Sequence, residues 1–181
     1  VTGVQTCALP IWGLNVTLPF KQQAWAMLAA SSAQGSALGS AQSTATLTPR
    51  AAAAEAVNTL HFGLDGRVLG DNTDGPGLVR DLSHNLGFAL SGRRVLLLGA
   101  GGAARGVIQP LLAAGVCSLH IANRDAARAQ ALVSQLRASL PASLPEPGAT
   151  SAAEPPLYAL ALADLADLPD AAAQPFDLII N

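Results

Sequence analysis

Residues 94–106 read R-V-L-L-L-G-A-G-G-A-A-R-G, and this stretch decides the fold. Residues 95–98 are apolar without interruption, which is typical of a strand buried on both faces of a parallel sheet. Glycines follow at once, and residues 103–114 are prone to form a helix. Strand, glycine-rich turn and helix in this order predict a phosphate-binding turn at the N-terminus of a helix.

The spacing of the small residues narrows this prediction to a dinucleotide. Gly99, Gly101 and Ala104 occupy the three positions of the Gly-x-Gly-x-x-Gly/Ala pattern. Gly99 permits the tight turn, Gly101 lets a pyrophosphate approach the backbone, and Ala104 keeps helix and strand close. The strand before the turn and the helix after it favour dinucleotide binding over a plain glycine-rich turn.

Composition limits the classes of function. The 181 residues are half apolar and 12% charged, with a net charge of −2, which predicts a compact soluble enzyme. The sequence has no basic arm and no basic–aromatic stripe, so we expect no nucleic-acid partner. Residues 22–49 are uncharged but rich in Ser, Gln and Thr, so we expect no membrane span. Cys7 and Cys117 have neither metal spacing nor a disulfide framework, so we expect no metal and a reducing, cytoplasmic location.

Strands and helices are expected to alternate along the chain, as in an α/β protein. Pro110 lies inside an expected helix and removes the hydrogen bond to the carbonyl of Gly106, so we expect a kink there. Thr73 or Asp74 is expected to cap the helix that follows. The predicted strands are residues 14–18, 57–62, 67–69, 95–98, 118–122, 157–160 and 176–180. The predicted helices are residues 20–30, 49–55, 76–86, 103–114 and 125–138, with a helical turn at 162–168.

Several segments do not fit a packed domain. Residues 1–11 (V-T-G-V-Q-T-C-A-L-P-I) resemble a translated sequencing adapter and are expected to be non-native, a real strand being the alternative. Residues 31–46 read as a surface insertion, and residues 139–156, with five prolines, as a loop. An apolar strand at 176–180 would end the chain on an unprotected sheet edge. We therefore expect a fragment that is cut at both ends.

The end of the second predicted strand bears on the choice of cofactor. An acidic residue there binds the ribose 2′-hydroxyl of NAD, whereas a basic one accommodates the 2′-phosphate of NADP. The sequence has Asn123, Arg124 and Asp125 there, followed by Arg128. The planar guanidinium of Arg124 suits a phosphate and favours NADP. Asp125 leaves NAD open, because it could repel the phosphate or pair with Arg128, which could also be a solvated surface residue.

Three further stretches complete a family pattern: N-V-T-L-P-F-K at residues 15–21, A-V-N-T at 56–59 and G-D-N-T-D-G at 70–75. With the glycine turn and N-R-D, they resemble shikimate dehydrogenase, the NADP-dependent enzyme that reduces 3-dehydroshikimate to shikimate in aromatic amino-acid biosynthesis. The likeness runs from about residue 13 to residue 181. It implies part of a substrate-binding catalytic α/β domain over residues 12–74. An incomplete Rossmann-like, doubly wound NADP domain would follow over residues 75–181.

The resemblance also implies the site, in the cleft between the two domains. Lys21 and Asp74 would be the catalytic pair. A lysine ammonium can protonate the oxygen that gains charge when hydride reaches a ketone carbon, and a nearby carboxylate keeps that lysine charged and oriented. The residues implied to bind substrate are Asn15, Thr17, Lys21, Asn58 and Asp74. Those implied to bind NADP are Gly99, Ala100, Gly101, Gly102, Ala103, Asn123, Arg124 and Arg128.

The sequence also departs from the family. A serine-bearing substrate loop and the strands after Asn181 are missing, so we expect this chain to be inactive by itself. Glu55 stands where the family commonly has glycine, and His61, His84 and His120 match no catalytic position. The alternatives are an NAD-dependent quinate/shikimate dehydrogenase, another reductase with the same cofactor domain, or a non-catalytic dinucleotide-binding module. A small-molecule substrate is expected, and a homodimer is compatible with the resemblance.

Overall fold

The computed structural model describes residues 11–33, 45–139, 157–167 and 175–181. The predictions for residues 1–10, 34–44 and 140–156, Cys7 included, lie outside the described residues. The chain divides into two compact units, Val1–Asn72 and Thr73–Asn181. The functional roles predicted for residues 12–74 and 75–181 stay predictions.

The first unit is built on a four-stranded sheet in the order β1-β3-β4-β2. Strands β1 (Gly13–Asn15), β3 (Thr59–Phe62) and β4 (Val68–Asp71) are antiparallel neighbours, whereas β2 (Ala45–Leu47) runs parallel to β4. A tight turn joins β3 and β4, because the amide of Gly63 donates to the carbonyl of Arg67 at 2.8 Å. Helix α1 (Lys21–Ala33) contributes Leu28 to a small core with Ala51 and Val57.

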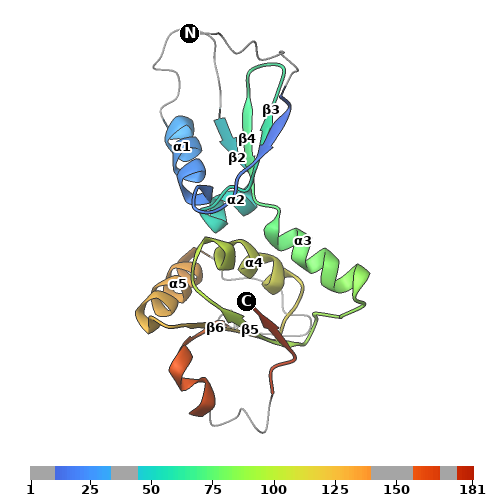
Figure 1. Cartoon of the computed structure of the whole chain (residues 1–181), viewed down its shortest axis with the longest axis vertical. Coiled ribbons are helices and arrows are strands. Elements are labelled where there is room, and N and C mark those ends of the chain that lie inside the picture. The colour runs from blue at the N-terminus through green and yellow to red at the C-terminus, as the bar shows by residue number, and fades with distance from the viewer. Residues whose placement is uncertain (1–10, 34–44, 140–156, 168–174) are drawn as a thin grey trace, which may run out of the picture. The chain divides into compact units, whose positions relative to one another are not determined.

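The second unit holds the predicted parallel sheet, in the order β7-β6-β5-β8. Its strands β5 and β6 are labelled in Figure 1. The order reverses between β5 and β8, and parallel α/β sheets bind ligands beyond the strand ends at such a reversal. This unit is therefore the Rossmann-like part of the α/β fold. Its strands are β5 (Arg94–Leu98), β6 (Ser118–Asn123), β7 (Leu157–Ala161) and β8 (Leu178–Ile180). Its helices are α3 (Asp74–Arg80), α4 (Gly102–Ala113) and α5 (Ala126–Ser139), with a 3-10 turn, η2, at Leu162–Asp167.

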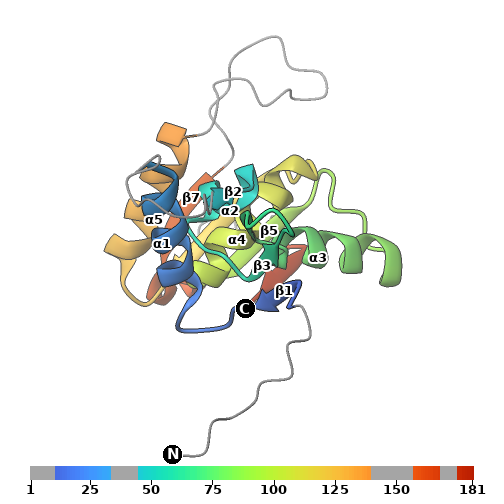
Figure 2. The same cartoon turned by 90° about the horizontal axis from the view of Figure 1, so that it is seen from above.

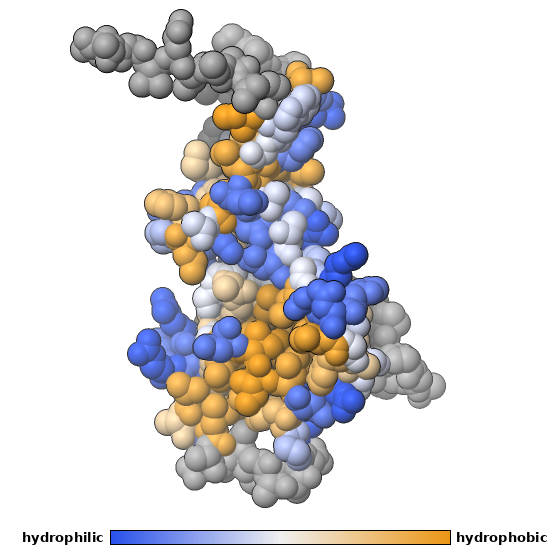
Figure 3. Space-filling model, turned by 45° about the vertical axis from the view of Figure 1, so that its right-hand side comes forward, coloured by the Kyte–Doolittle hydropathy of each residue, from blue (hydrophilic) through white to orange (hydrophobic). Residues whose placement is uncertain are grey.

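One face of this sheet carries the core and the other is partly exposed. Val95, Leu119 and Leu157 are fully buried with the apolar residues of α4 and α5. The next residues along the strands point to the opposite face. There Tyr158 is 47% exposed and Ile179 59% exposed. Figure 3 shows apolar side chains gathered on the surface of this unit.

Helix α3 begins earlier than predicted and changes its geometry. It starts at Asp74 rather than residue 76, and a π-helical turn, η1 (Asp81–Asn85), replaces its predicted second half. Thr73 is the N-cap residue, but its side chain makes no capping hydrogen bond, so that part of the capping prediction is wrong. Gly87, with φ +62°, follows the turn as expected for a C-terminal glycine.

Strand β2 was not predicted, and the bounds of β1, β3 and β4 differ from the predicted ones. Ala45–Leu47 falls at the end of the segment assigned to an insertion, yet it pairs with β4. Strand β1 stops at Asn15, β3 starts at Thr59, and β4 extends to Asp71 into the predicted polar turn. Helix α4 continues through Pro110 to Ala113, so the proline does not break it.

Helix α2 (Pro49–Ala54) shows why its ends lie where they do. The hydroxyl of Thr48 accepts the amide of Ala51 at 3.2 Å, and Pro49 takes the first helical position, as predicted. Glu55 ends the helix with φ +50°, in the left-handed region that side chains disfavour. Glycine adopts this conformation without that cost.

We expect Glu55→Gly to raise the free energy of unfolding by about 0.5–1 kcal/mol, since relief of the left-handed strain exceeds the added entropy of the unfolded chain. Glu55→Ala is the matched control, because it removes the same side-chain contacts and keeps a Cβ. Urea denaturation followed by circular dichroism measures both variants. Equal stability of the glycine and alanine variants would show that the backbone at Glu55 is not strained.

Candidate functional site

The glycine-rich turn has the geometry that an anion requires. Gly99 has φ +110°, and its amide donates to the carbonyl of Ala122 at 2.8 Å, which ties the turn to β6. A Cβ built on Gly101 would have no described atom within 4 Å apart from its chain neighbours. Helix α4 starts at Gly102, after Ala100 and Gly101, so its unpaired N-terminal amides and positive dipole end lie at the turn. This predicted cofactor loop can thus hold a pyrophosphate against bare backbone.

The residues after β6 resolve the role of Asp125. Its carboxylate accepts the amides of Ala127 at 3.1 Å and Arg128 at 3.4 Å, so it caps helix α5. The side-chain amide of Asn123 donates to the carbonyl of Asp125 at 3.0 Å and closes the turn. In the described part of the chain, neither the Arg124 nor the Arg128 guanidinium has an ion-pair partner. Both arginine side chains are exposed, in the residues that directly follow β6.

Backbone hydrogen bonds bring the predicted substrate residues of the first unit together. The amide of Val16, between Asn15 and Thr17, donates to the carbonyl of Asn58 at 2.7 Å. The amide of Val57 donates to the carbonyl of Lys21 at 2.9 Å. The ends of β1, α1 and β3 are thus joined where all four predicted residues lie. The hydroxyl of Thr59 also donates to the side-chain oxygen of Asn58 at 2.9 Å, which orients that amide.

Strand β4 ends in an ionic cluster that sequence reasoning missed. The carboxylate of Asp71 accepts hydrogen bonds from the Arg50 guanidinium, from the Thr48 hydroxyl at 2.7 Å and from the Asn72 amide at 2.8 Å. The Arg50 hydrogen bonds, followed by those of Thr48 and Asn72, outweigh desolvation and hold the pKa of Asp71 below its usual value. The only sequence signal was an arginine inside the first turn of a capped helix.

The same strand end supports Asn58 directly. The carbonyl of Asp71 accepts the amide of Asn58 at 2.9 Å. The side chain of Asn72, which is only 1% exposed, donates to the carbonyl of Ala56 at 3.1 Å. A buried amide that is satisfied in this way specifies one backbone geometry. Arg50 and Thr48 therefore fix the position of Asp71, and the backbone of Asp71 positions Asn58.

Lys21 and Asp74 lie in different units. Lys21 opens α1 in the first unit, and Asp74 opens α3 in the second. Their predicted meeting stays a prediction. His120 stacks on Tyr158 with 4.6 Å between ring centroids, so its ring takes part in packing on the sheet. No cluster of metal-ligating side chains occurs among the described residues, and no helix in that part of the chain is long and apolar enough to span a membrane.

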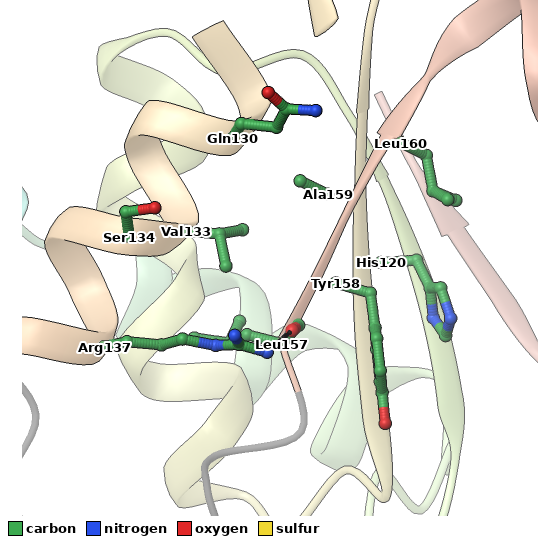
Figure 4. A pocket seen from close by; sticks show the side chains of 9 residues that line it. All are labelled: His120, Gln130, Val133, Ser134, Arg137, Leu157, Tyr158, Ala159 and Leu160. Carbon is green, nitrogen blue, oxygen red and sulfur yellow. Dashed lines mark hydrogen bonds between the residues drawn. The ribbon is translucent and has the colours of Figure 1, made fainter. Parts of the chain in front are cut away.

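A separate cavity of about 450 Å³ lies between α5 and the edge strand β7 (Figure 4). Gln130, Ser134 and Arg137 line it from one side of the helix. The Arg137 guanidinium donates to the carbonyl of Leu157 at 2.8 Å, and this hydrogen bond links α5 to β7. None of the predicted site residues lines this cavity.

The family model and the curated relatives that match this chain are all described as dehydrogenases of shikimate. The model of the family described as shikimate / quinate 5-dehydrogenase matches residues 81–146. The shikimate dehydrogenase (NADP(+)) of Aromatoleum aromaticum is 52% identical over 129 residues, which are 71% of this chain and 40% of that protein. The enzyme of the same name from Methylobacillus flagellatus is 46% identical over 169 residues, 93% of this chain and 49% of that protein.

A solved structure that resembles this chain has the same description. Shikimate 5-dehydrogenase from Thermus thermophilus, in complex with NADP(H) and shikimate, superposes with a TM-score of 0.55 at 35% identity. The match covers 70% of this chain and 41% of that structure. The chain thus spans between two fifths and one half of the length of the relatives described here.

The ionic cluster predicts a pH-dependent stability. We expect Arg50→Gln to lower the free energy of unfolding by about 1 kcal/mol at pH 7, a value reduced because Arg50 is partly exposed. Asp71 has a lowered pKa in the folded state, so its stabilising effect is complete above its unfolded pKa of about 3.9 and is lost as the pH falls through the folded pKa. The difference between variant and wild type should therefore vanish in strong acid.

Urea denaturation at pH 7 and below pH 3 measures this effect. Arg67→Gln is the matched control, because the Arg67–Asp65 pair is largely exposed and should contribute little at either pH. An Arg50→Gln penalty that is equal at both pH values would contradict the assignment to Asp71.

Proposed function

This chain belongs to the shikimate/quinate dehydrogenase family, and we propose that the protein carrying it reduces 3-dehydroshikimate to shikimate, reversibly, with NADPH. The single observation that carries the proposal is the 46–52% identity to NADP-dependent shikimate dehydrogenases over most of the chain. The clustering of Asn15, Thr17, Lys21 and Asn58 at one end of the first sheet supports it.

The second unit fits the cofactor by its own geometry. Gly101 leaves open space above the backbone, and α4 directs its N-terminus there. Arg124 and Arg128 supply the positive charge that distinguishes a 2′-phosphate from a hydroxyl. The carboxylate of Asp125 is bound to the amides of α5, which weakens the case for NAD. We therefore propose NADP as the cofactor, and when bound it supplies the hydride.

The residues of the chain would handle the substrate and its proton. The Lys21 ammonium donates a proton to the ketone oxygen as that oxygen gains charge, and the Asp74 carboxylate orients the ammonium. The amides of Asn58 and Asn15 and the hydroxyl of Thr17 bind ring hydroxyls. Thr59 engages the oxygen of the Asn58 amide and so presents its nitrogen as a donor.

We also propose the partners and the cellular location of the protein. The ligands are small molecules, with no nucleic acid or membrane partner, and the protein works in the cytoplasm. A homodimer is compatible with this proposal. An NAD-dependent quinate/shikimate dehydrogenase remains the competing activity, and the cofactor experiment below separates the two.

We expect Lys21→Ala and Asp74→Ala, made in the natural protein that carries this chain, to lower kcat about 10²–10⁴-fold, because each removes part of the proton-transfer pair. The assay follows NADPH oxidation by its absorbance with 3-dehydroshikimate as substrate. Asp81→Ala is the control, since Asp81 lies in the π-helical turn and accepts only from Asn85 among the side-chain bonds seen there. Turnover like that of the wild type in both site variants would overturn their roles.

We expect Arg124→Ala to raise the KM for NADP about 10–100-fold, the effect of losing a charge-assisted hydrogen bond of about 1.5–3 kcal/mol. The KM for NAD should change little, because NAD has no 2′-phosphate. Arg67→Ala, at an exposed arginine of the first unit, is the control for loss of a positive charge. Steady-state kinetics with both cofactors measure the effect, and a better KM for NAD than for NADP in the wild type would favour the competing activity.

A further inference from the structure

Asp74 lies at the start of the second unit, next to a glycine that contacts helix α4. It is the first residue of α3, and the next residue, Gly75, is buried. Helix α3 contacts α4, and two perpendicular views show its start near α4 while its far end projects away (Figure 1, Figure 2). The place of the Asp74 backbone is therefore set by how Gly75 meets α4.

That contact leaves no room for a side chain. A Cβ on Gly75 would lie 2.3 Å from the carbonyl oxygen of Gly106 and 2.5 Å from Cγ of Pro110. Both are stiff partners, because one is helix backbone and the other is a closed ring. Glycine at position 75 thus lets the two helices approach to a distance that alanine would forbid.

Pro110 also affects the Gly106 carbonyl, which Gly75 contacts. It has no amide hydrogen, so the carbonyl of Gly106 lacks its usual partner four residues later in the helix. Gly106 is itself buried, and its carbonyl faces Gly75. The start of α3 therefore rests on the Gly106 carbonyl and the Pro110 ring of α4.

This patch lies close to the cofactor turn. Gly106 is four residues after Gly102, which at 1.5 Å per residue is about 6 Å along the helix axis. Helix α4 thus holds the glycine turn at its first residue and the start of α3 about one turn later. The cofactor turn and the residue before Gly75 are fixed to one rigid element.

We propose that Gly75 and Pro110 form a positioning contact that sets the Asp74 carboxylate relative to the cofactor turn. Gly75 acts through Asp74 and touches neither substrate nor cofactor. This inference rests on the proposed function, because it assigns Asp74 a part in the reaction. It adds that the accuracy of that carboxylate depends on a glycine–proline contact between α3 and α4.

The test is Gly75→Ala in the natural protein that carries this chain. We expect kcat for 3-dehydroshikimate to fall about 10–100-fold, since a displacement of about 1 Å at a reacting group has that effect. The dissociation constant of NADPH, measured by fluorescence titration, should stay within about threefold of the wild type. Gly77→Ala is the matched control in the same helix, because a Cβ there would meet nothing within 4 Å among the described atoms.

A second arm separates positioning from general damage to the fold. In an Asp74→Asn background, Gly75→Ala should cause little further loss of kcat, because the group it positions is already gone. An equal fold-loss in both backgrounds would overturn the inference. Pro110→Ala adds no heavy atoms and restores an amide hydrogen that can bond to the carbonyl of Gly106, so it serves if Gly75→Ala does not fold. It should lower kcat less than Gly75→Ala would, and only when Asp74 is present.

The outcomes also distinguish this inference from the proposed function. A wild type that turns over 3-dehydroshikimate, with kcat unchanged by Gly75→Ala, removes the positioning contact and leaves the function standing. A wild type with no turnover of 3-dehydroshikimate removes the function itself.

Discussion

The second unit depends on how closely helix α4 approaches its neighbours. Ala104 and Gly106 are buried in that helix, and larger residues there would push it from the sheet or from α3. Close approach keeps the N-terminus of α4 directly after strand β5, where the reversal of strand order opens a crevice. The position of the glycine turn, the core and the start of α3 all depend on this one tightly packed helix.

The first unit solves a different problem, which is to hold polar side chains at the ends of short strands. Its strands have only three or four residues, and its core is small. Precision comes instead from a chain of hydrogen bonds that runs from Arg50 through Asp71 to Asn58. Polar networks that are fully satisfied specify geometry where apolar packing is thin.

Sequence reasoning predicted the parallel sheet and its helices well, because long apolar runs and the glycine turn are strong local signals. It missed β2, since three residues at the edge of a Ser/Ala/Gly-rich stretch become a strand only by pairing with β4. The π-helical turn at Asp81–Asn85 also has no local signature in the sequence.

The candidate site was only partly predictable from local patterns. The cofactor turn followed from spacing, whereas Lys21 and Asp74 came from the family resemblance, because a single lysine or aspartate carries no distinguishing mark. The support around them stayed hidden, since Arg50 and Asp71 are 21 residues apart and meet only in the folded sheet.

The cap on helix α5 constrains how cofactor preference can change in evolution or by engineering. A shift toward NAD needs an acceptor for two ribose hydroxyls, and the nearest carboxylate in the sequence, on Asp125, already accepts two backbone amides. Recruiting it would uncap the helix, so under the role proposed for Arg124, loss of that arginine alone would weaken the discrimination between the two cofactors without reversing it. A true reversal needs a new acid at the tip of β6, introduced without disturbing the cap.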